Sequence, residues 1–149
     1  MFRRVRAADP PGIVALLADD AIGRSRESAA LPLDGGYAAA FEAIESDVNQ
    51  LLAVAERDGR VVGCLQLSFI PGLSRRGMLR GQIESVRIAS GERGRGLGHQ
   101  FLEWAIGECR RRGCGMVQLT ADKSRKDALR FYKSLGFRAL HEGLKLPLE

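Results

Sequence analysis

The stretch GERGRGLGH, Gly91–His99, alternates glycine with arginine and runs straight into a strongly patterned segment, QFLEWAIGECRRRG. Apolar residues recur every four positions from Leu97 to Cys109, which predicts a helix from about Gly96 to Arg112 with one buried stripe. A helix N-terminus presents unpaired N–H groups, glycine allows the backbone to approach a ligand, and arginine adds donors for phosphate oxygens. The stretch therefore predicts an anion site between a strand and a helix, with an ordinary solvated turn as the alternative.

The glycine spacing argues against two common phosphate-binding motifs. A dinucleotide fingerprint, G-x-G-x-x-G, fits Gly94 and Gly96 but would place its third glycine at His99, and the string G-x-x-x-x-G-K-[ST] does not occur. The pattern that fits is R-x-x-G-x-G, met by Arg93, Gly96 and Gly98.

This pattern resembles the acetyl-CoA motif of the GNAT N-acetyltransferase superfamily, [RQ]-x-x-G-x-[GA], which lies between a strand and a helix. Two other segments resemble the family in the same order. IESVRI, at 83–88, is similar to the strand that lines the cofactor and often carries a glutamate. DALRFYKSLGF, at 127–137, is similar to a late helix whose tyrosine faces the thioester. The resemblance is continuous from Gln82 to Phe137, whereas before Arg60 only the order of elements agrees.

The resemblance implies an enzyme that moves an acetyl group from acetyl-CoA to a primary amine by direct transfer in a ternary complex. The acceptor would be a small-molecule or peptide amine of unknown identity, and a homodimer is compatible with the family. A CoA-binding sensor or scaffold without catalysis is the alternative within the same fold. A nucleic-acid-binding role is disfavoured because the arginines are dispersed and no basic and aromatic residues interleave.

The resemblance also implies which residues contact the cofactor. Backbone groups of Val86, Arg87 and Ile88 would meet the pantetheine arm, while the side chains of Val86 and Ile88 are expected in the core. Arg125 stands where many members carry asparagine, and it would reach a CoA phosphate or lie exposed. The pyrophosphate would lie against the loop and helix start, namely Arg93, Gly94, Arg95, Gly96, Leu97, Gly98 and His99.

Two residues are candidates for acid–base chemistry. Tyr132 would protonate the departing CoA thiolate, and its structural alternative is a core tyrosine on a helix face. Glu84 would take the proton of the attacking amine, and its alternative is a solvent-facing strand residue. Asp122 and His141 are rivals for the base. A route through a cysteine nucleophile is disfavoured, since Cys109 falls on the buried helix stripe and no base is evident beside it.

The whole chain, residues 1–149, is expected to form one α/β domain with a single mixed, mostly antiparallel central sheet flanked by helices, the GNAT acyltransferase fold. Helices are predicted from Asp9, at 37–50, at 96–112 and at 124–136. Strands are predicted at 2–6, in a hairpin at 51–70 that turns at Asp58–Gly59, at 78–89, in a central buried position at 114–121, and at 137–140 and 143–148.

Composition limits the function classes less than the motifs do. The 149 residues fit one domain, and 45% are apolar, as in an ordinary globular protein. The net charge of +5 favours an anionic partner without choosing one. Three cysteines without metal-ligand spacing predict reduced thiols and no metal site. Since no apolar run suits a signal peptide or a membrane span, the expected location is the cytoplasm.

Overall fold

The computed structural model describes residues 1–149 and contains one five-stranded sheet in the order β1-β2-β3-β4-β5. The first four strands are antiparallel to their neighbours, and β5 joins β4 in parallel. This arrangement confirms the expected mixed, mostly antiparallel sheet. The strands are β1 (Phe2–Arg4), β2 (Gln50–Arg57), β3 (Arg60–Ile70), β4 (Arg80–Ile88) and β5 (Met116–Leu119).

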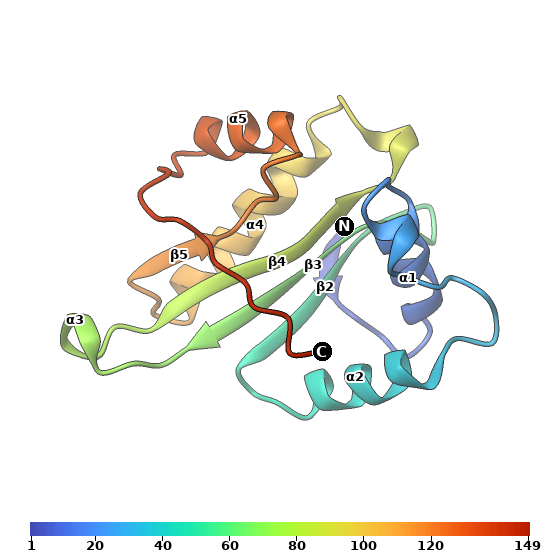
Figure 1. Cartoon of the computed structure of the whole chain (residues 1–149), viewed down its shortest axis with the longest axis horizontal. Helices are drawn as coiled ribbons and strands as arrows, with labels where there is room; N and C mark the ends of the chain where they lie inside the picture. Colours follow the sequence, from blue (N-terminus) through green and yellow to red (C-terminus); the bar gives the residue numbers. More distant parts are fainter.

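Helices cover both faces of the sheet (Figure 1). One face packs against α1 and α2, and the other packs against α4 and α5. No helix is long and apolar enough to cross a membrane. The helices are α1 (Pro10–Ala18), α2 (Gly35–Glu45), the single turn α3 (Ser74–Gly77), α4 (Leu97–Arg111) and α5 (Lys126–Ser134), with 3-10 turns at Gly23–Ser25 and Ser90–Glu92.

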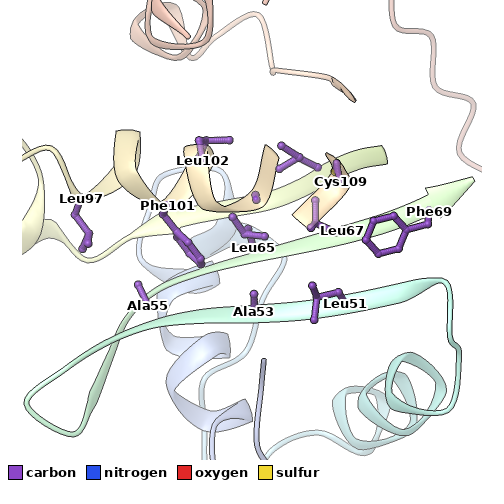
Figure 2. Packing of buried hydrophobic residues seen from close by; sticks show 12 residues of the cluster. Leu51, Ala53, Ala55, Leu65, Leu67, Phe69, Leu97, Phe101, Leu102 and Cys109 are labelled. Atoms are coloured by element: carbon purple, nitrogen blue, oxygen red, sulfur yellow. The ribbon is translucent and has the colours of Figure 1, made fainter. Parts of the chain in front are cut away.

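The main core lies between the sheet and α4, as Figure 2 shows. The apolar stripe expected on this helix is confirmed, because Phe101, Ala105 and Cys109 are fully buried. Gly81 of β4 permits this close approach, since a Cβ there would overlap the Cys109 sulfur. The facing strand residues are Leu51, Ala53 and Ala55 of β2 and Leu65, Leu67 and Phe69 of β3.

A buried ion-pair cluster ties the N-terminal segments together. The Arg3 guanidinium donates to both oxygens of Asp9, at 2.8 and 3.1 Å, and to Glu56 Oε2 at 2.6 Å. Asp9 also accepts from the Arg6 N–H at 2.6 Å. These bonds join β1, the start of α1 and β2, and the bond from Arg3 lowers the pKa of Asp9 more than any other contact.

The hairpin between β2 and β3 forms as its sequence predicts. Asp58 and Gly59 have φ of 51° and 74°, which gives both central residues of the turn the left-handed backbone of a tight hairpin.

Two expectations about the C-terminal third are wrong. The segment 114–121 is not a central buried strand: β5 has four partly exposed residues and forms the edge of the sheet. No strand forms at 137–140 or 143–148 either. Figure 1 shows this last segment leaving α5 and running across the sheet toward α2. Its leucines alternate as in a strand, but a strand also needs a hydrogen-bonded neighbour, and none lies beside it.

Candidate functional site

A β-bulge in β4 shapes the site. Ser85 has a φ of 56°, and around it Gln66 pairs with Glu84 whereas Cys64 pairs with Arg87. The extra residue on β4 resets the alternation of the strand. Directly paired residues of adjacent strands project to the same face. Glu84 and Arg87 therefore face the same side of the sheet although they are three residues apart.

Beyond this bulge, β4 has no neighbour on the β5 side. The ladder with β5 runs only from Arg80 to Ile83 of β4. The Ala89 N–H donates to the Val62 carbonyl of β3 at 2.8 Å, so strand alternation directs the main-chain groups of Val86 and Ile88 away from β3. Main-chain groups at such an opening can pair with the amides of an extended ligand.

Two arginines contact the carbonyls at this opening. The Arg87 guanidinium donates to the Val86 carbonyl at 2.8 Å, and Arg93 Nε donates to the Ile88 carbonyl at 3.1 Å. Arg93 therefore connects the glycine–arginine loop to the end of β4. The carbonyl of each strand residue still has a second lone pair for a ligand.

The loop before α4 has the backbone expected of an anion cradle. Gly94 and Gly96 have φ of 78° and 80°, in the left-handed region, and a Cβ on either would meet no atom within 4 Å. Helix α4 begins without a side-chain cap, and its first backbone bond is from the Gln100 N–H to the Gly96 carbonyl. The preceding N–H groups of the first turn thus have no hydrogen-bond partner within the protein.

The remaining loop residues differ in what surrounds them. Arg95 and His99 are exposed, and His99 Nδ1 lies 3.6 Å from Glu103 of the next turn. The Leu97 side chain is buried, so only its main chain is available to a ligand. Gly98 lies against α5, where a Cβ would touch the ring of Phe131 at 3.5 Å.

Tyr132 lies on α5 in a largely apolar setting. Its ring lies 5.3 Å from that of Phe131 and 6.0 Å from that of Phe137. Its phenol makes no hydrogen bond within the protein. Burial raises the pKa of Tyr132, while the charges of Arg87 and Arg125 partly oppose this shift. The phenol therefore stays protonated at neutral pH and can serve as a proton donor.

Glu84 and its rivals have different surroundings. The Glu84 carboxylate is exposed and accepts a hydrogen bond from Gln82, which in turn accepts one from Gln118 at 2.8 Å. The Asp122 carboxylate is held by the Ser124 hydroxyl and N–H, and these bonds lower its pKa. His141 is exposed in the C-terminal segment.

A charged cluster that the sequence did not indicate lies beside these groups. Asp20, after α1, places its Oδ2 2.8 Å from Arg125 at the start of α5 and 3.3 Å from Arg87 Nε on β4. Its Oδ1 accepts the Gly23 N–H at 2.5 Å. Since the three residues come from distant parts of the chain, no local pattern could have predicted that they meet.

Comparison with known proteins agrees with this geometry. The family model described as "Acetyltransferase (GNAT) family" matches residues 16–137, and the chain belongs to this family. The aminoalkylphosphonate N-acetyltransferase of Salmonella typhimurium is 33% identical over 101 residues, covering 68% of this chain and 65% of that protein. The glucosamine 6-phosphate N-acetyltransferase of Trypanosoma brucei brucei is 39% identical over 90 residues, covering 60% and 59%. The matches thus span less than two thirds of these relatives.

Solved structures match over nearly the whole chain. A protein from Bacillus halodurans C-125 described as a transcriptional regulator is 46% identical, with a TM-score of 0.97 over 99% of both chains. The glucosamine-6-phosphate N-acetyltransferase of Arabidopsis thaliana is 22% identical, with a TM-score of 0.82 over 100% of this chain and 98% of that one. The second likeness supports the fold alone.

Proposed function

We propose that the chain is an acetyl-CoA-dependent N-acetyltransferase that acetylates a primary amine by direct transfer in a ternary complex. The observation that carries the proposal is the opening of β4 away from β5 directly beside the left-handed glycine loop at the start of α4. A strand edge without a strand partner and an uncapped helix start lie together, as a ligand with an amide arm and a pyrophosphate requires.

The open space at the loop glycines supports a fit to CoA, because side chains there would fill the cradle. Acetyl-CoA, when bound, supplies an activated acetyl thioester. The main chain of Val86 and Ile88 would hold the pantetheine amides. The main chain of Arg87, also expected to contact this arm, pairs with Cys64 and therefore faces β3 instead of the opening. The pyrophosphate would be held by the loop and helix start, Arg93, Gly94, Arg95, Gly96, Leu97, Gly98 and His99.

The acid and base roles follow from the surroundings of two side chains. Glu84, exposed on the open face of β4, would accept the proton of the attacking amine. Tyr132 would donate its proton to the departing thiolate, and its raised pKa supports that role. Direct transfer is supported by the burial of two of the three thiols: burial raises the pKa of Cys64 and of Cys109 to about 12, so neither supplies a thiolate nucleophile at neutral pH. Cys114, the other cysteine weighed as a nucleophile, is partly exposed and has no base beside it.

The decisive experiment is release of free CoA from acetyl-CoA with a panel of amines. The panel includes aminoalkylphosphonates and glucosamine 6-phosphate, for which two relatives are named, together with an aminoglycoside, a peptide N-terminus and lysine. We expect amine-dependent release and an acetylated product by mass spectrometry. Hydrolysis that no amine accelerates would contradict the proposal.

A CoA-binding sensor without catalysis is the second candidate, and the relative described as a transcriptional regulator favours it. Both functions require acetyl-CoA binding, but only the enzyme requires turnover. Tight acetyl-CoA binding by calorimetry together with no turnover across the panel would select the sensor.

We also propose that the chain forms a homodimer. Two features support this: β5 exposes an unpaired strand edge, and three leucines of the C-terminal segment are almost fully exposed. Uncovered strand edges and apolar side chains favour association with another chain.

A further inference from the structure

The cluster around Asp20 carries an uncompensated positive charge. One carboxylate faces two guanidinium groups, those of Arg87 and Arg125, which are called the arginine pair below. Arg26 adds a smaller positive influence that opposes protonation of Arg87, although Arg26 itself lies 3.5 Å from the Glu27 carboxylate. The side chains of Arg87, Asp20 and Arg125 are only 12%, 18% and 30% exposed, so water screens these charges weakly.

The arginine pair has donors to spare. The spare donor of Arg87 is Nη2, which makes no hydrogen bond, since Nη1 donates to the Val86 carbonyl and the buried Nε faces Asp20 Oδ2 at 3.3 Å. A guanidinium carries five N–H donors, and in Arg125 a single nitrogen contacts Asp20, at 2.8 Å. An incoming oxyanion can therefore bind to the arginine pair without first displacing Asp20.

The arginine pair lies beside the proposed reaction centre. Because of the bulge at Ser85, Arg87 faces the same side of the sheet as Glu84, at roughly 10 Å along the strand by the usual rise per residue. The charges of both arginines also reach the phenol of Tyr132. The glycine–arginine loop, by contrast, has its own arginines for a pyrophosphate.

We infer that the acceptor amine carries an oxyanion group, a phosphate, phosphonate or carboxylate, which the arginine pair binds while the amine lies near Glu84. This inference rests on the proposed function and names the substrate class of the same site. Arg87 and Glu84 lie roughly 10 Å apart along the strand, a span that a small acceptor and the two side chains can bridge together. A planar, bidentate donor suits such an oxyanion better than a point charge does.

The test compares matched acceptors with and without the oxyanion: glucosamine 6-phosphate with glucosamine, and 2-aminoethylphosphonate with ethanolamine. For the wild type we expect kcat/KM to favour the anionic member by about tenfold or more, the scale of one charge-assisted hydrogen bond. Arg87→Gln and Arg125→Gln should reduce that preference about tenfold, chiefly through KM. Arg125→Lys should restore part of it, and Arg60→Gln, at an exposed hairpin position, should leave it unchanged.

Three readouts separate the inference from its alternatives. Unchanged calorimetric affinity for acetyl-CoA in Arg125→Gln supports an acceptor site, whereas a matching loss would show that Arg125 holds a CoA phosphate and overturn the inference. Turnover without preference for the anionic acceptor also overturns it. If no amine is acetylated, 2-aminoethylphosphonate is titrated into the CoA-saturated protein. Binding that depends on Arg87 and Arg125 then supports the anion site while the proposed catalysis fails, and no binding overturns both.

Discussion

In the proposed mechanism Tyr132 is the proton donor and Glu84 is the proton acceptor, and their surroundings differ accordingly. Tyr132 is surrounded by aromatic rings, and its phenol is kept neutral by burial. Glu84 is exposed to water, and its carboxylate accepts a hydrogen bond from the Gln82 amide. The two predictions at this scale separate these roles.

Tyr132→Phe should lower kcat by roughly 10- to 1,000-fold with little change in acetyl-CoA affinity, because a general acid acts mainly in the transition state. Phenylalanine keeps the ring and its contacts with Phe131 and Phe137. Burial raises the pKa of Tyr132 from its usual 10.0, so the phenol stays protonated at neutral pH. The wild-type kcat should therefore show no loss in that range from deprotonation of Tyr132. The measurement is kcat against pH together with a calorimetric titration. A wild-type rate in the variant would return Tyr132 to a packing role.

Glu84→Gln should lower kcat/KM most at low pH, where little of the acceptor amine is already neutral and a base is needed. The defect should fade as the pH approaches the pKa of the amine itself, since the free amine then needs no base. Rate profiles of wild type and variant on one acceptor measure this convergence. A constant ratio at every pH would show that Glu84 acts in some other way.

At the scale of elements, the start of α4 and the N-terminal ion-pair cluster illustrate two kinds of dependence on neighbours. The helix start depends on backbone conformation, through Gly94 and Gly96 in the left-handed region. The N-terminal cluster depends on side chains from β1, β2 and the start of α1 meeting in a buried position. The start of α4 can therefore be disrupted by replacing one glycine, and the N-terminal cluster by replacing one carboxylate.

Gly96→Val should abolish measurable acetyl-CoA binding while the protein stays folded. A β-branched residue is strained at a φ of 80°, so the loop must change conformation, yet the added side chain meets no neighbouring atom. Gly107→Ala, on the same helix and also in open space, is the matched control and should keep full affinity. Binding to the wild type should also weaken as salt rises. Unchanged affinity of Gly96→Val by calorimetry would refute the cradle.

Asp9→Asn should destabilise the fold by about 2 kcal/mol at neutral pH, because Asp9 accepts charge-assisted bonds from Arg3. The pKa of Asp9 is lowered below its usual 3.8, so its stabilisation is present above that value and is lost as the pH falls through the lowered pKa. The free energy of unfolding in urea should therefore differ between wild type and Asp9→Asn near pH 7, and this difference should be smaller in strong acid. Asp19→Asn is the control, because the Asp19 side chain is exposed and makes no hydrogen bond. An equal loss of stability in both variants would contradict the role given to Asp9.

For the whole molecule, the C-terminal segment leaves a run of apolar side chains uncovered. Leu144, Leu146 and Leu148 are 93%, 83% and 91% exposed in the single chain. If a second copy covers them, sedimentation velocity should show twice the mass of one chain. Replacing all three leucines by serine should then give the monomer with unchanged secondary structure by circular dichroism. A wild-type protein that sediments as one chain at micromolar concentration would count against the homodimer.

What the sequence alone determined about this protein is local. The apolar stripe of α4, the Asp58–Gly59 turn and the left-handed glycines before α4 follow from periodicity and from the backbone freedom of glycine, so each could be predicted from a few consecutive residues. The same local patterns carried the family resemblance, because its motif lies between adjacent elements.

Which distant residues meet depends on the packing of the elements against one another. The register of β4 against β3 places the bulge at Ser85, and this shift brings Glu84 and Arg87 to one face. The convergence of Asp20, Arg87 and Arg125 depends on three elements packing together. The edge position of β5 and the absence of C-terminal strands likewise depend on hydrogen-bonding neighbours. A periodic pattern indicates which element one segment can form. Whether two segments pair depends on the free energy of the contacts between them, and the pattern of a single segment does not determine those contacts.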